Sequence, residues 1–372
     1  MRPRSAYPVT DVHVRWLTGP GSYGRSDADD AAMDAAVMAR AIGKPVRVQY
    51  TRAEGTGWDP KGPASIHRAR AAIDAQGNVT AYEFSSKGFS RVDVNTNGSK
   101  PFDTLAGQAL GVALKSGDNF GVPAESYEFA NKRTSWETIA PLLDRSSPLR
   151  TSHLRDPVGP QIHFASESFI DEVAAGLNQD PIEFRLKHTK DARDTALIKG
   201  AAQKFGWDTR PSPRKDQTGD KVSGRGIAYS QRNGTRVAVI AEVEVDRRTG
   251  KVRVTKAVSA VDAGLIINPD GVTNQIEGGI IQSASWTLKE QVKYDQQRVL
   301  TRSWADYPIL TFPEVPAVEV VLLNRPEEKS LGTGEGSQGP TVAAIANAIA
   351  NATGKRLRDL PFTRERVKAA LA

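Results

Sequence analysis

The second half of the chain has the clearest alternation of apolar and polar positions. Residues 224–230, 235–246 and 251–261 follow the two-residue period that predicts β-strands. Residues 341–353 instead carry apolar side chains at helical spacing, and Gly354 follows them where a glycine often ends a helix. This part of the chain therefore predicts several strands and a final buried helix.

Weaker patterns predict further elements, separated by turns rich in Gly and Pro. A β-hairpin is expected over 67–84, with a Gln-Gly-Asn turn in its middle. Alternation also predicts a strand over 45–52, whereas residues 85–150 show no clear period and are expected to be irregular. The other predicted helices cover residues 31–41, 162–177, 182–187, 195–205, 272–289 and 361–371, and strands and turns are expected over 291–324.

A polar segment over 208–223, rich in Pro, Lys and Asp, separates the two halves. We therefore predict a mixed α/β (α+β) protein with two subdomains, residues 1–207 and 224–372, joined by this linker. A length of 372 residues leaves room for such domains to bury a sizeable core. Neither an apolar run of about 18 residues nor the apolar core of a signal peptide is visible, so no membrane span is expected and the compartment stays open.

Charge and cysteine content exclude several classes of function. The net charge is +7, but basic and acidic residues are interspersed and no basic run exceeds three residues, which gives nucleic-acid binding little support. The chain has no cysteine, and its five histidines lack the spacing of metal ligands. We therefore predict no metal ligand among its side chains, and any metal must be held by another group.

The most suggestive stretch for chemistry is the loop over 331–340. It contains four glycines in ten residues, carries Glu335 in the middle, and leads directly into the helix predicted over 341–353. A glycine loop at a helix N-terminus with one carboxylate suits anion binding or general-base chemistry. The alternative is a flexible turn with a solvated glutamate.

Two other loops carry candidate residues. The glycine turn over 19–25 precedes the helix at 31–41, for which Ser26 is a suitable N-cap, and an ordinary tight turn is the alternative interpretation. The loop over 149–161 contains Arg155, which could pair with an anion or a substrate oxygen. A surface salt bridge is an equally good interpretation of this arginine.

Several loops in order along the whole chain carry a family resemblance. They are Gly21-Ser-Tyr-Gly-Arg25, Leu154-Arg-Asp-Pro-Val-Gly-Pro-Gln161, Asp180-Pro-Ile-Glu-Phe-Arg-Leu186, Asp262-Ala-Gly264, Gln275-Ile-Glu-Gly278 and Gly334-Glu335. With these motifs the chain resembles the C-terminal half of the molybdopterin-binding large subunit of the xanthine dehydrogenase/aldehyde oxidase family of molybdenum hydroxylases. Within this family, the chain looks most similar to the bacterial branch that includes nicotinate dehydrogenase and isoquinoline 1-oxidoreductase.

The resemblance implies a role for each matching residue. Tyr23 and Gly24 match an aromatic–glycine pair beside the molybdenum, and Gln275, with Gly334, matches the cofactor-contacting positions. Arg155 matches an arginine that orients substrate or stabilises an anion, and Glu335 matches the catalytic base. In this family the base deprotonates Mo–OH, a water-derived hydroxyl is added to an aldehyde or N-heteroaromatic carbon, and hydride passes to Mo=S.

The resemblance also implies a cofactor and partners. The cofactor is molybdopterin, for which a cytosine dinucleotide form is one option, and the iron–sulfur clusters lie on a small [2Fe-2S] partner subunit. A flavin or cytochrome subunit could accept the electrons. The phosphate-binding loops of the family's N-terminal half do not appear, so another chain is expected to supply them. The alternative is a truncated or scaffold subunit that keeps the fold without cofactor or activity.

Overall fold

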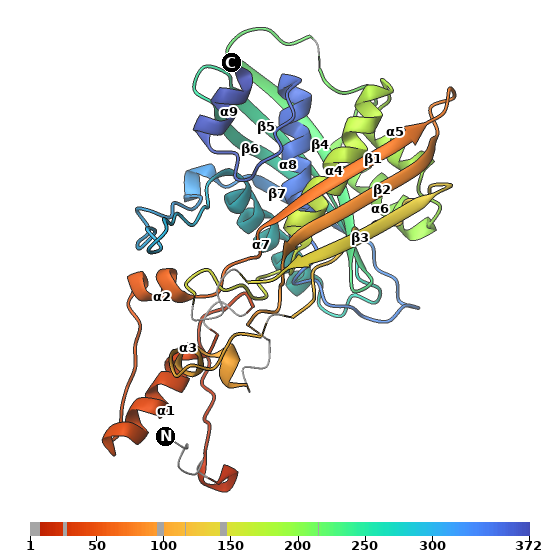
Figure 1. The fold of residues 1–372 in the computed structure, drawn as a ribbon. Helices are drawn as coiled ribbons and strands as arrows, with labels where there is room; N and C mark the ends of the chain where they lie inside the picture. The colour runs from red at the N-terminus through yellow and green to blue at the C-terminus, as the bar shows by residue number, and fades with distance from the viewer. Residues whose placement is uncertain (1–7, 25–27, 95–99, 116, 142–146, 215) are drawn as a thin grey trace.

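The computed structural model describes residues 8–24, 28–94, 100–115, 117–141, 147–214 and 216–372. Two mixed sheets form its framework (Figure 1). The first has the order β1-β2-β3, with β1 and β2 antiparallel and β2 and β3 parallel. Its strands are β1 (Ser65–Ile73), β2 (Val79–Phe89) and β3 (Lys132–Ile139).

The second sheet has the order β4-β5-β6-β7. Its first three strands form an antiparallel meander, and β7 runs parallel to β6 after a long connection through a helix. The strands are β4 (Lys221–Arg232), β5 (Thr235–Asp246), β6 (Lys251–Asp262) and β7 (Ala317–Leu322). The long strands are buried on both faces, since apolar clusters cover each side.

Helices pack on both faces of the β4–β7 sheet, and α1, α2 and α3 lie apart from the two sheets, below them in Figure 1. In the described part of the chain the α-helices are α1 (Asp30–Ile42), α2 (Arg52–Trp58), α3 (Leu105–Ala109), α4 (Gly159–Gly176), α5 (Pro181–Lys187), α6 (Ala192–Phe205), α7 (Pro269–Leu288), α8 (Gln338–Thr353) and α9 (Arg364–Leu371). Short 3-10 turns occur at Val9–Asp11, Pro101–Asp103 and Phe312–Glu314. No helix in these described ranges has both the length and the apolar character to cross a membrane.

Most expected elements are confirmed. The hairpin is β1–β2, the three consecutive strands are β4, β5 and β6, and each predicted helix is present with bounds shifted by a few residues. Gly354 ends α8 in the left-handed conformation, as expected. The mixed α/β fold class is therefore correct. The two-subdomain division stays a prediction, although β4 begins at Lys221, inside the predicted linker.

Two expectations are wrong. Residues 45–51 do alternate between partly buried and exposed, but no described strand pairs with them, and Thr51 caps α2 instead of continuing an extended segment. Residues 85–150 are not wholly irregular, because β3 and α3 lie there. The sequence of β3 alternates poorly because both faces are partly exposed. Ser26, the expected cap of α1, lies outside the described residues, and Asp29 stands at the N-cap position.

Helix α8 is the central element of the fold. It packs on β4 and β5 with one face and on α4 with another, and residues Gln338 to Ala352 are all buried. Close approach to β4 depends on Gly224 and Gly226, since a Cβ on Gly226 would lie 2.3 Å from the Ala348 backbone nitrogen. The small residues of α8 make this backbone-to-backbone contact possible. The loop that carries Glu335 therefore enters a helix with a fixed position.

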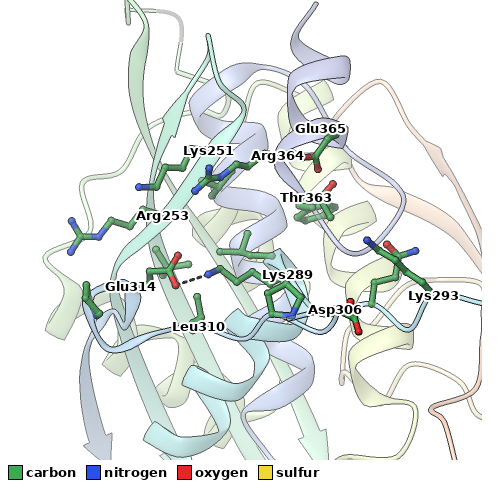
Figure 2. A pocket seen from close by; sticks show the side chains of 17 residues that line it. Lys251, Arg253, Lys289, Lys293, Asp306, Leu310, Glu314, Thr363, Arg364 and Glu365 are labelled. Atoms are coloured by element: carbon green, nitrogen blue, oxygen red, sulfur yellow. Dashed lines mark hydrogen bonds and ion pairs between the residues drawn. The ribbon is translucent and has the colours of Figure 1, made fainter. Parts of the chain in front are cut away.

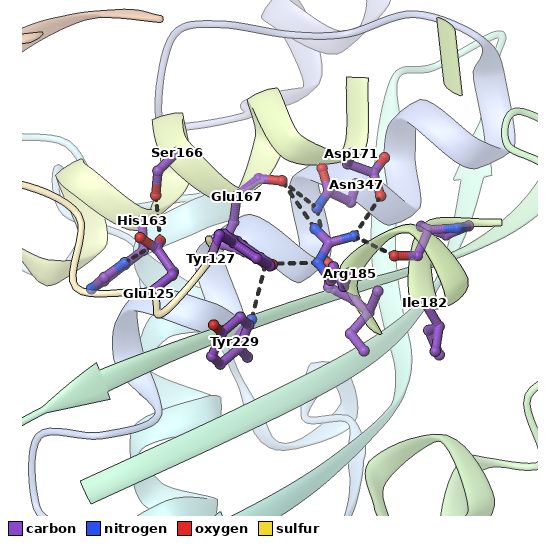
Figure 3. A network of polar contacts seen from close by, with 12 residues as sticks. Glu125, Tyr127, His163, Ser166, Glu167, Asp171, Ile182, Arg185, Tyr229 and Asn347 are labelled. Carbon is purple, nitrogen blue, oxygen red and sulfur yellow. Dashed lines mark hydrogen bonds and ion pairs between the residues drawn. The ribbon is translucent and has the colours of Figure 1, made fainter. Parts of the chain in front are cut away.

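A buried polar network ties α4 to α5, α8 and β4 (Figure 3). Glu167 accepts hydrogen bonds from the Tyr127 hydroxyl (2.6 Å), Arg185 Nε (3.0 Å) and the Tyr229 amide (3.0 Å). Asn347 of α8 donates to the Glu167 carbonyl at 3.3 Å. Glu167 and Arg185 are both fully buried, so each charge depends on the other for compensation.

We predict that replacing Gly226 with Ala will destabilise the protein by about 1–3 kcal/mol or more, because the added methyl group meets the backbone of α8. Gly176→Ala is the matched control, since nothing lies within 4 Å of its Cβ position. Urea unfolding of the two variants measures the difference. Equal free energies of unfolding would contradict the close-packing argument.

We predict that Arg185→Met will cost about 3–5 kcal/mol of stability, because it leaves Glu167 buried without its counter-charge. Arg70→Met removes a pair on the surface, where the Arg70 side chain is 83% exposed, and is expected to cost no more than about 1 kcal/mol. Equilibrium unfolding of both variants tests this. A small effect at Arg185 would show that the network contributes little to stability.

Candidate functional site

The loop over residues 332–339 is fixed by contacts from several elements. Thr235 at the start of β5 donates its hydroxyl to the Gly332 carbonyl at 2.8 Å. Arg155 Nε donates to the Gly334 carbonyl at 2.7 Å, and Ser337 Oγ donates to the Ile276 carbonyl of α7 at 3.2 Å. These bonds hold the loop against β5, α7 and the segment that precedes α4, so this glycine-rich loop has a defined position in the structure.

Arg155 is the residue that brings the predicted site together. Besides Gly334, its guanidinium donates to the Gln275 carbonyl (3.0 Å), to Gln275 Oε1 (3.2 Å) and to Gln282 Oε1 (3.1 Å). Among the described residues the hydrogen bonds of its guanidinium go to carbonyl and amide oxygens, and none goes to a carboxylate, which does not favour the interpretation as a surface salt bridge. Arg155 thus connects the Glu335 loop to one face of α7.

Tyr23 and Gly24 also reach this place. The Arg155 guanidinium lies 5.8 Å from the centre of the Tyr23 ring, and Gly24 forms an antiparallel bridge with Leu154. Gly24 has φ +117°, and a Cβ there would lie 2.3 Å from the His153 carbonyl oxygen, so this position requires glycine. The Tyr23 side chain is 56% exposed, so its ring remains available to a bound group.

Glu335 forms an ion pair with Arg232. Arg232 Nε and Nη2 both donate to Glu335 Oε2, at 3.2 and 3.0 Å. Arg232 ends β4 and is followed by the Asn233-Gly234 turn, in which both residues have positive φ, as tight hairpins require. The hairpin therefore places the Arg232 side chain beside the loop over residues 332–339, which Thr235 also contacts. Within the described structure Glu335 Oε1 accepts no hydrogen bond, whereas Oε2 accepts both bonds from Arg232.

Asp156 lies behind this ion pair. It is 4% exposed, its Oδ2 accepts from the Gly339 amide at 3.1 Å, and its Oδ1 lies 3.8 Å from Arg232 Nε. Burial raises the pKa of the Asp156 carboxyl to about 6, although His163, Arg232 and the Gly339 amide act in the opposite direction and the Glu335 charge raises it further. Two carboxylates therefore share one arginine.

The backbone around Asp156 is in an unusual conformation. Asp156 has φ +57° and Val158 has φ +60°, and Tyr23 across the site has φ +53°. A β-branched residue such as Val158 rarely adopts the left-handed region, and such outliers concentrate at functional sites. Gly159 is needed here, because a Cβ would lie 2.0 Å from Asp156 Oδ2.

His163 forms a second buried pair next to Asp156. Its Nδ1 lies 2.8 Å from Glu125 Oε1, and both side chains are buried (Figure 3). Burial opposes charge on both groups, but each lowers the cost of the other, so the pKa of His163 is raised and that of Glu125 is lowered. A Cβ on Gly339 would lie 2.6 Å from the His163 ring, so His163 and Asp156 both lie close to Gly339.

The structure brings together all the residues that the sequence singled out. Glu335, Arg155, Gln275, Gly334, Tyr23 and Gly24 lie around one loop. Sequence analysis missed Arg232, Asp156 and Gln282. The Asn-Gly turn signal could have indicated that Arg232 ends a hairpin, but nothing in the sequence shows which loop that hairpin meets.

The residues present suit a polar organic cofactor. The described residues contain no cluster of three or more His, Cys, Asp or Glu side chains that could hold a metal. Gln275 is exposed, and in the described structure its amide Nε2 makes no hydrogen bond, so a donor is available beside the Arg155 guanidinium. An amide donor, a guanidinium and an exposed tyrosine fit a pterin with its phosphate. The pterin, and not a protein side chain, would then ligate the metal.

A separate basic cavity lies away from this loop. This cavity has a volume of about 450 Å³. Its lining side chains come from β6, α7, α9 and the segment that ends at Glu314 (Figure 2). Lys289 and Glu314 form an ion pair in it. None of the candidate site residues lines this cavity.

Comparison with known proteins identifies the chain's relatives. Residues 201–316 match the family model described as molybdopterin cofactor-binding domain. The chain is 40% identical to one subunit of the nicotinate dehydrogenase of Pseudomonas putida, over 97% of this chain and 30% of that protein. It is 29% identical to the beta subunit of isoquinoline 1-oxidoreductase from Brevundimonas diminuta, over 92% of this chain and 41% of that protein. The chain therefore spans less than half the length of these relatives.

Solved structures share the fold. The aldehyde oxidoreductase of Desulfovibrio gigas matches with a TM-score of 0.72 and 18% identity, over 94% of this chain and 54% of that chain. Quinoline 2-oxidoreductase of Pseudomonas putida 86 matches with a TM-score of 0.73 and 14% identity, over 94% of this chain and 67% of that chain. The fold is thus that of the molybdenum-cofactor-binding domains of these oxidoreductases.

The chain belongs to the xanthine dehydrogenase/aldehyde oxidase family of molybdopterin-dependent oxidoreductases. It corresponds to the C-terminal part of the family's molybdopterin-binding subunit, as the motifs predicted.

The raised pKa of Asp156 predicts a pH-dependent stability. Because the folded-state pKa of about 6 exceeds the unfolded value, the folded protein binds more protons between the two values. The free energy of unfolding should therefore fall by up to ~3 kcal/mol as pH rises from about 4 to about 6. Urea unfolding across this range measures the slope, and Asp156→Asn should remove this contribution. Identical slopes in both proteins would contradict the assignment.

Proposed function

We propose that this chain is the catalytic portion of a molybdenum hydroxylase. The observation that carries the proposal is the convergence of Glu335, Arg155, Gln275 and Tyr23 around the Gly334 carbonyl, which joins residues from four separate stretches of the chain. Such convergence is not required by packing alone, since Tyr23 and Gln275 are exposed. The reaction is the water-derived hydroxylation of an aldehyde or N-heteroaromatic carbon.

The molybdenum–pterin group, when bound, supplies the oxidising centre that accepts the substrate's electrons. The chain supplies the polar groups around it. Gln275 and Arg155 offer hydrogen-bond donors to the pterin or its phosphate, and the exposed Tyr23 ring lies beside them. The cytosine dinucleotide form of the cofactor is part of this proposal. The names of the bacterial relatives that act on nicotinate and isoquinoline favour an N-heteroaromatic substrate over an aldehyde.

Glu335 acts as the base in this proposal. Its Oε2 is held by two hydrogen bonds from Arg232, so Oε1 is presented in a fixed direction to accept the proton. Arg155 adds positive charge beside the same loop and can stabilise negative charge that develops on the substrate. In this proposal the two residues have separate roles, proton transfer for Glu335 and charge stabilisation for Arg155.

Partner chains complete the enzyme in this proposal. A small [2Fe-2S] subunit receives the electrons, a further chain or segment provides the rest of the cofactor cradle, and a flavin or cytochrome subunit is a suitable acceptor. Exposed apolar side chains near the described N-terminal segment support a covering partner, because Val9, Val14, Trp16 and Leu17 are each at least 80% exposed. A protein without a partner rarely leaves so many adjacent apolar residues in water.

We predict that Glu335→Gln will abolish turnover and leave bound molybdenum unchanged, because the amide cannot accept the proton yet keeps the shape of the side chain. A loss of 10²-fold or more in kcat is expected, roughly the contribution of a positioned base. Glu327→Gln, at an exposed nearby position, is the matched control. Near-normal kcat in Glu335→Gln would exclude the base role.

Molybdenum content separates this function from the alternative of a scaffold subunit without cofactor. The complex is purified with its partner chains, and molybdenum and released pterin are measured per chain. About one molybdenum per complex is expected, since each complex has one such site. A complex that assembles without molybdenum would favour the scaffold role.

A further inference from the structure

Two neighbouring residues hold opposite ends of the loop that carries Glu335. Arg155 donates to the Gly334 carbonyl just before Glu335, and Asp156 accepts from the Gly339 amide just after it. The left-handed backbone at Asp156 turns consecutive side chains toward these two positions. Two consecutive residues, Arg155 and Asp156, thus hold both ends of the loop. Sequence analysis singled out Arg155 but not Asp156.

Asp156 also contacts the partner of Glu335. Arg232 donates twice to Glu335 Oε2, and its Nε lies 3.8 Å from Asp156 Oδ1 on the other side. The Asp156 carboxylate has little freedom to leave this place, because it is 4% exposed and packs against Gly159. The arginine therefore lies between the buried carboxylate of Asp156 and the partly exposed carboxylate of Glu335.

The charged groups that face Asp156 come from every side. Arg232 approaches from β4, Glu335 from the loop before α8, and His163 from α4 with its partner Glu125. Arg91, from the segment after β2, interacts electrostatically with Arg232, Glu335 and Asp156. Asp156 is the buried carboxylate that compensates the charge of Arg232 in addition to Glu335. Without it, the positive charge of Arg232 would act on Glu335 alone.

We propose that Asp156 is a positioning residue that sets, through Arg232 and the Gly339 amide, the orientation of the Glu335 carboxylate. The inference rests on the proposed function of Glu335 as the base and adds a residue to it. A buried carboxylate on one side of an arginine restricts where its guanidinium can lie. Asp156 therefore holds Arg232 in place, and Arg232 in turn holds Glu335 in the direction in which it would accept a proton.

The test is the pH profile of kcat in the assembled, molybdenum-loaded enzyme. Asp156→Asn keeps an acceptor for the Gly339 amide and tolerates the left-handed backbone, but removes the charge. We expect the wild-type kcat to rise about tenfold as Asp156 loses its proton near pH 6, and we expect Asp156→Asn to lack this rise and keep the lower kcat, with KM unchanged. A rise near pH 6 that persists in Asp156→Asn would overturn the proposal.

Two further variants control the result. Asp171→Asn neutralises an equally buried acid of α4, which pairs with Arg185 and Arg356 instead, and this variant should keep the rise of kcat near pH 6. Asp156→Gly removes the carboxylate while accepting φ +57° without strain, so it replaces Asp156→Asn if that variant fails to fold. Loss of the rise near pH 6 in Asp171→Asn as well would overturn the specific role of Asp156.

A readout without turnover separates this inference from the proposed function. The infrared band of a protonated carboxyl should disappear in the wild type as pH rises through about 6, and this change should be missing in Asp156→Asn. If Glu335→Gln stays active, the proposed function fails whatever Asp156 does. If Glu335→Gln is inactive while Asp156→Asn keeps the wild-type profile and band, only the role of Asp156 fails.

Discussion

The contact between α8 and β4 is the constraint on which the rest of the structure depends. A helix of small residues lies against two strand glycines at backbone distance, with α4 on another side, so it has no room to shift or turn. Because Glu335 stands three residues before Gln338, the first residue of this helix, the position of α8 sets where its carboxylate can reach. Packing of the core thus determines the geometry of the site.

In the segment around Arg155, contacts with this fixed core stabilise an unfavourable backbone conformation. Asp156 and Val158 occupy the left-handed region, which costs free energy, and the bonds from Arg155 and Asp156 to the Glu335 loop offset that cost. The buried Glu167–Arg185 pair further along fixes α4 to the rest of the core. Strain at the site and rigidity behind it are therefore parts of one arrangement.

The motifs that carry the family resemblance divide into two physical groups. Asp180 caps α5, accepts from the Trp207 indole and the Arg210 amide, and leads to buried Arg185, so that motif maintains the fold. Asp262 likewise pairs with Arg193 and Arg325. Arg155, Gln275 and the Glu335 loop instead present polar atoms to solvent beside one another. Only this second group has the exposure that binding a cofactor requires.

The sequence by itself determined the helices, the hairpin, the meander and the residues of the Glu335 loop. These depend on local spacing, on Gly and Pro positions and on caps, which are all visible in a short window. It could not reveal that residues 45–51 have no partner strand in the described part of the chain, or that β3 pairs with β2, because pairing depends on distant segments. Nor could it show that Arg232 meets Glu335, about a hundred residues later, or that Asp156 is buried against that arginine. Only tertiary packing determines which charged side chains are buried together, and their proximity in a low-dielectric environment determines the electrostatics of the site.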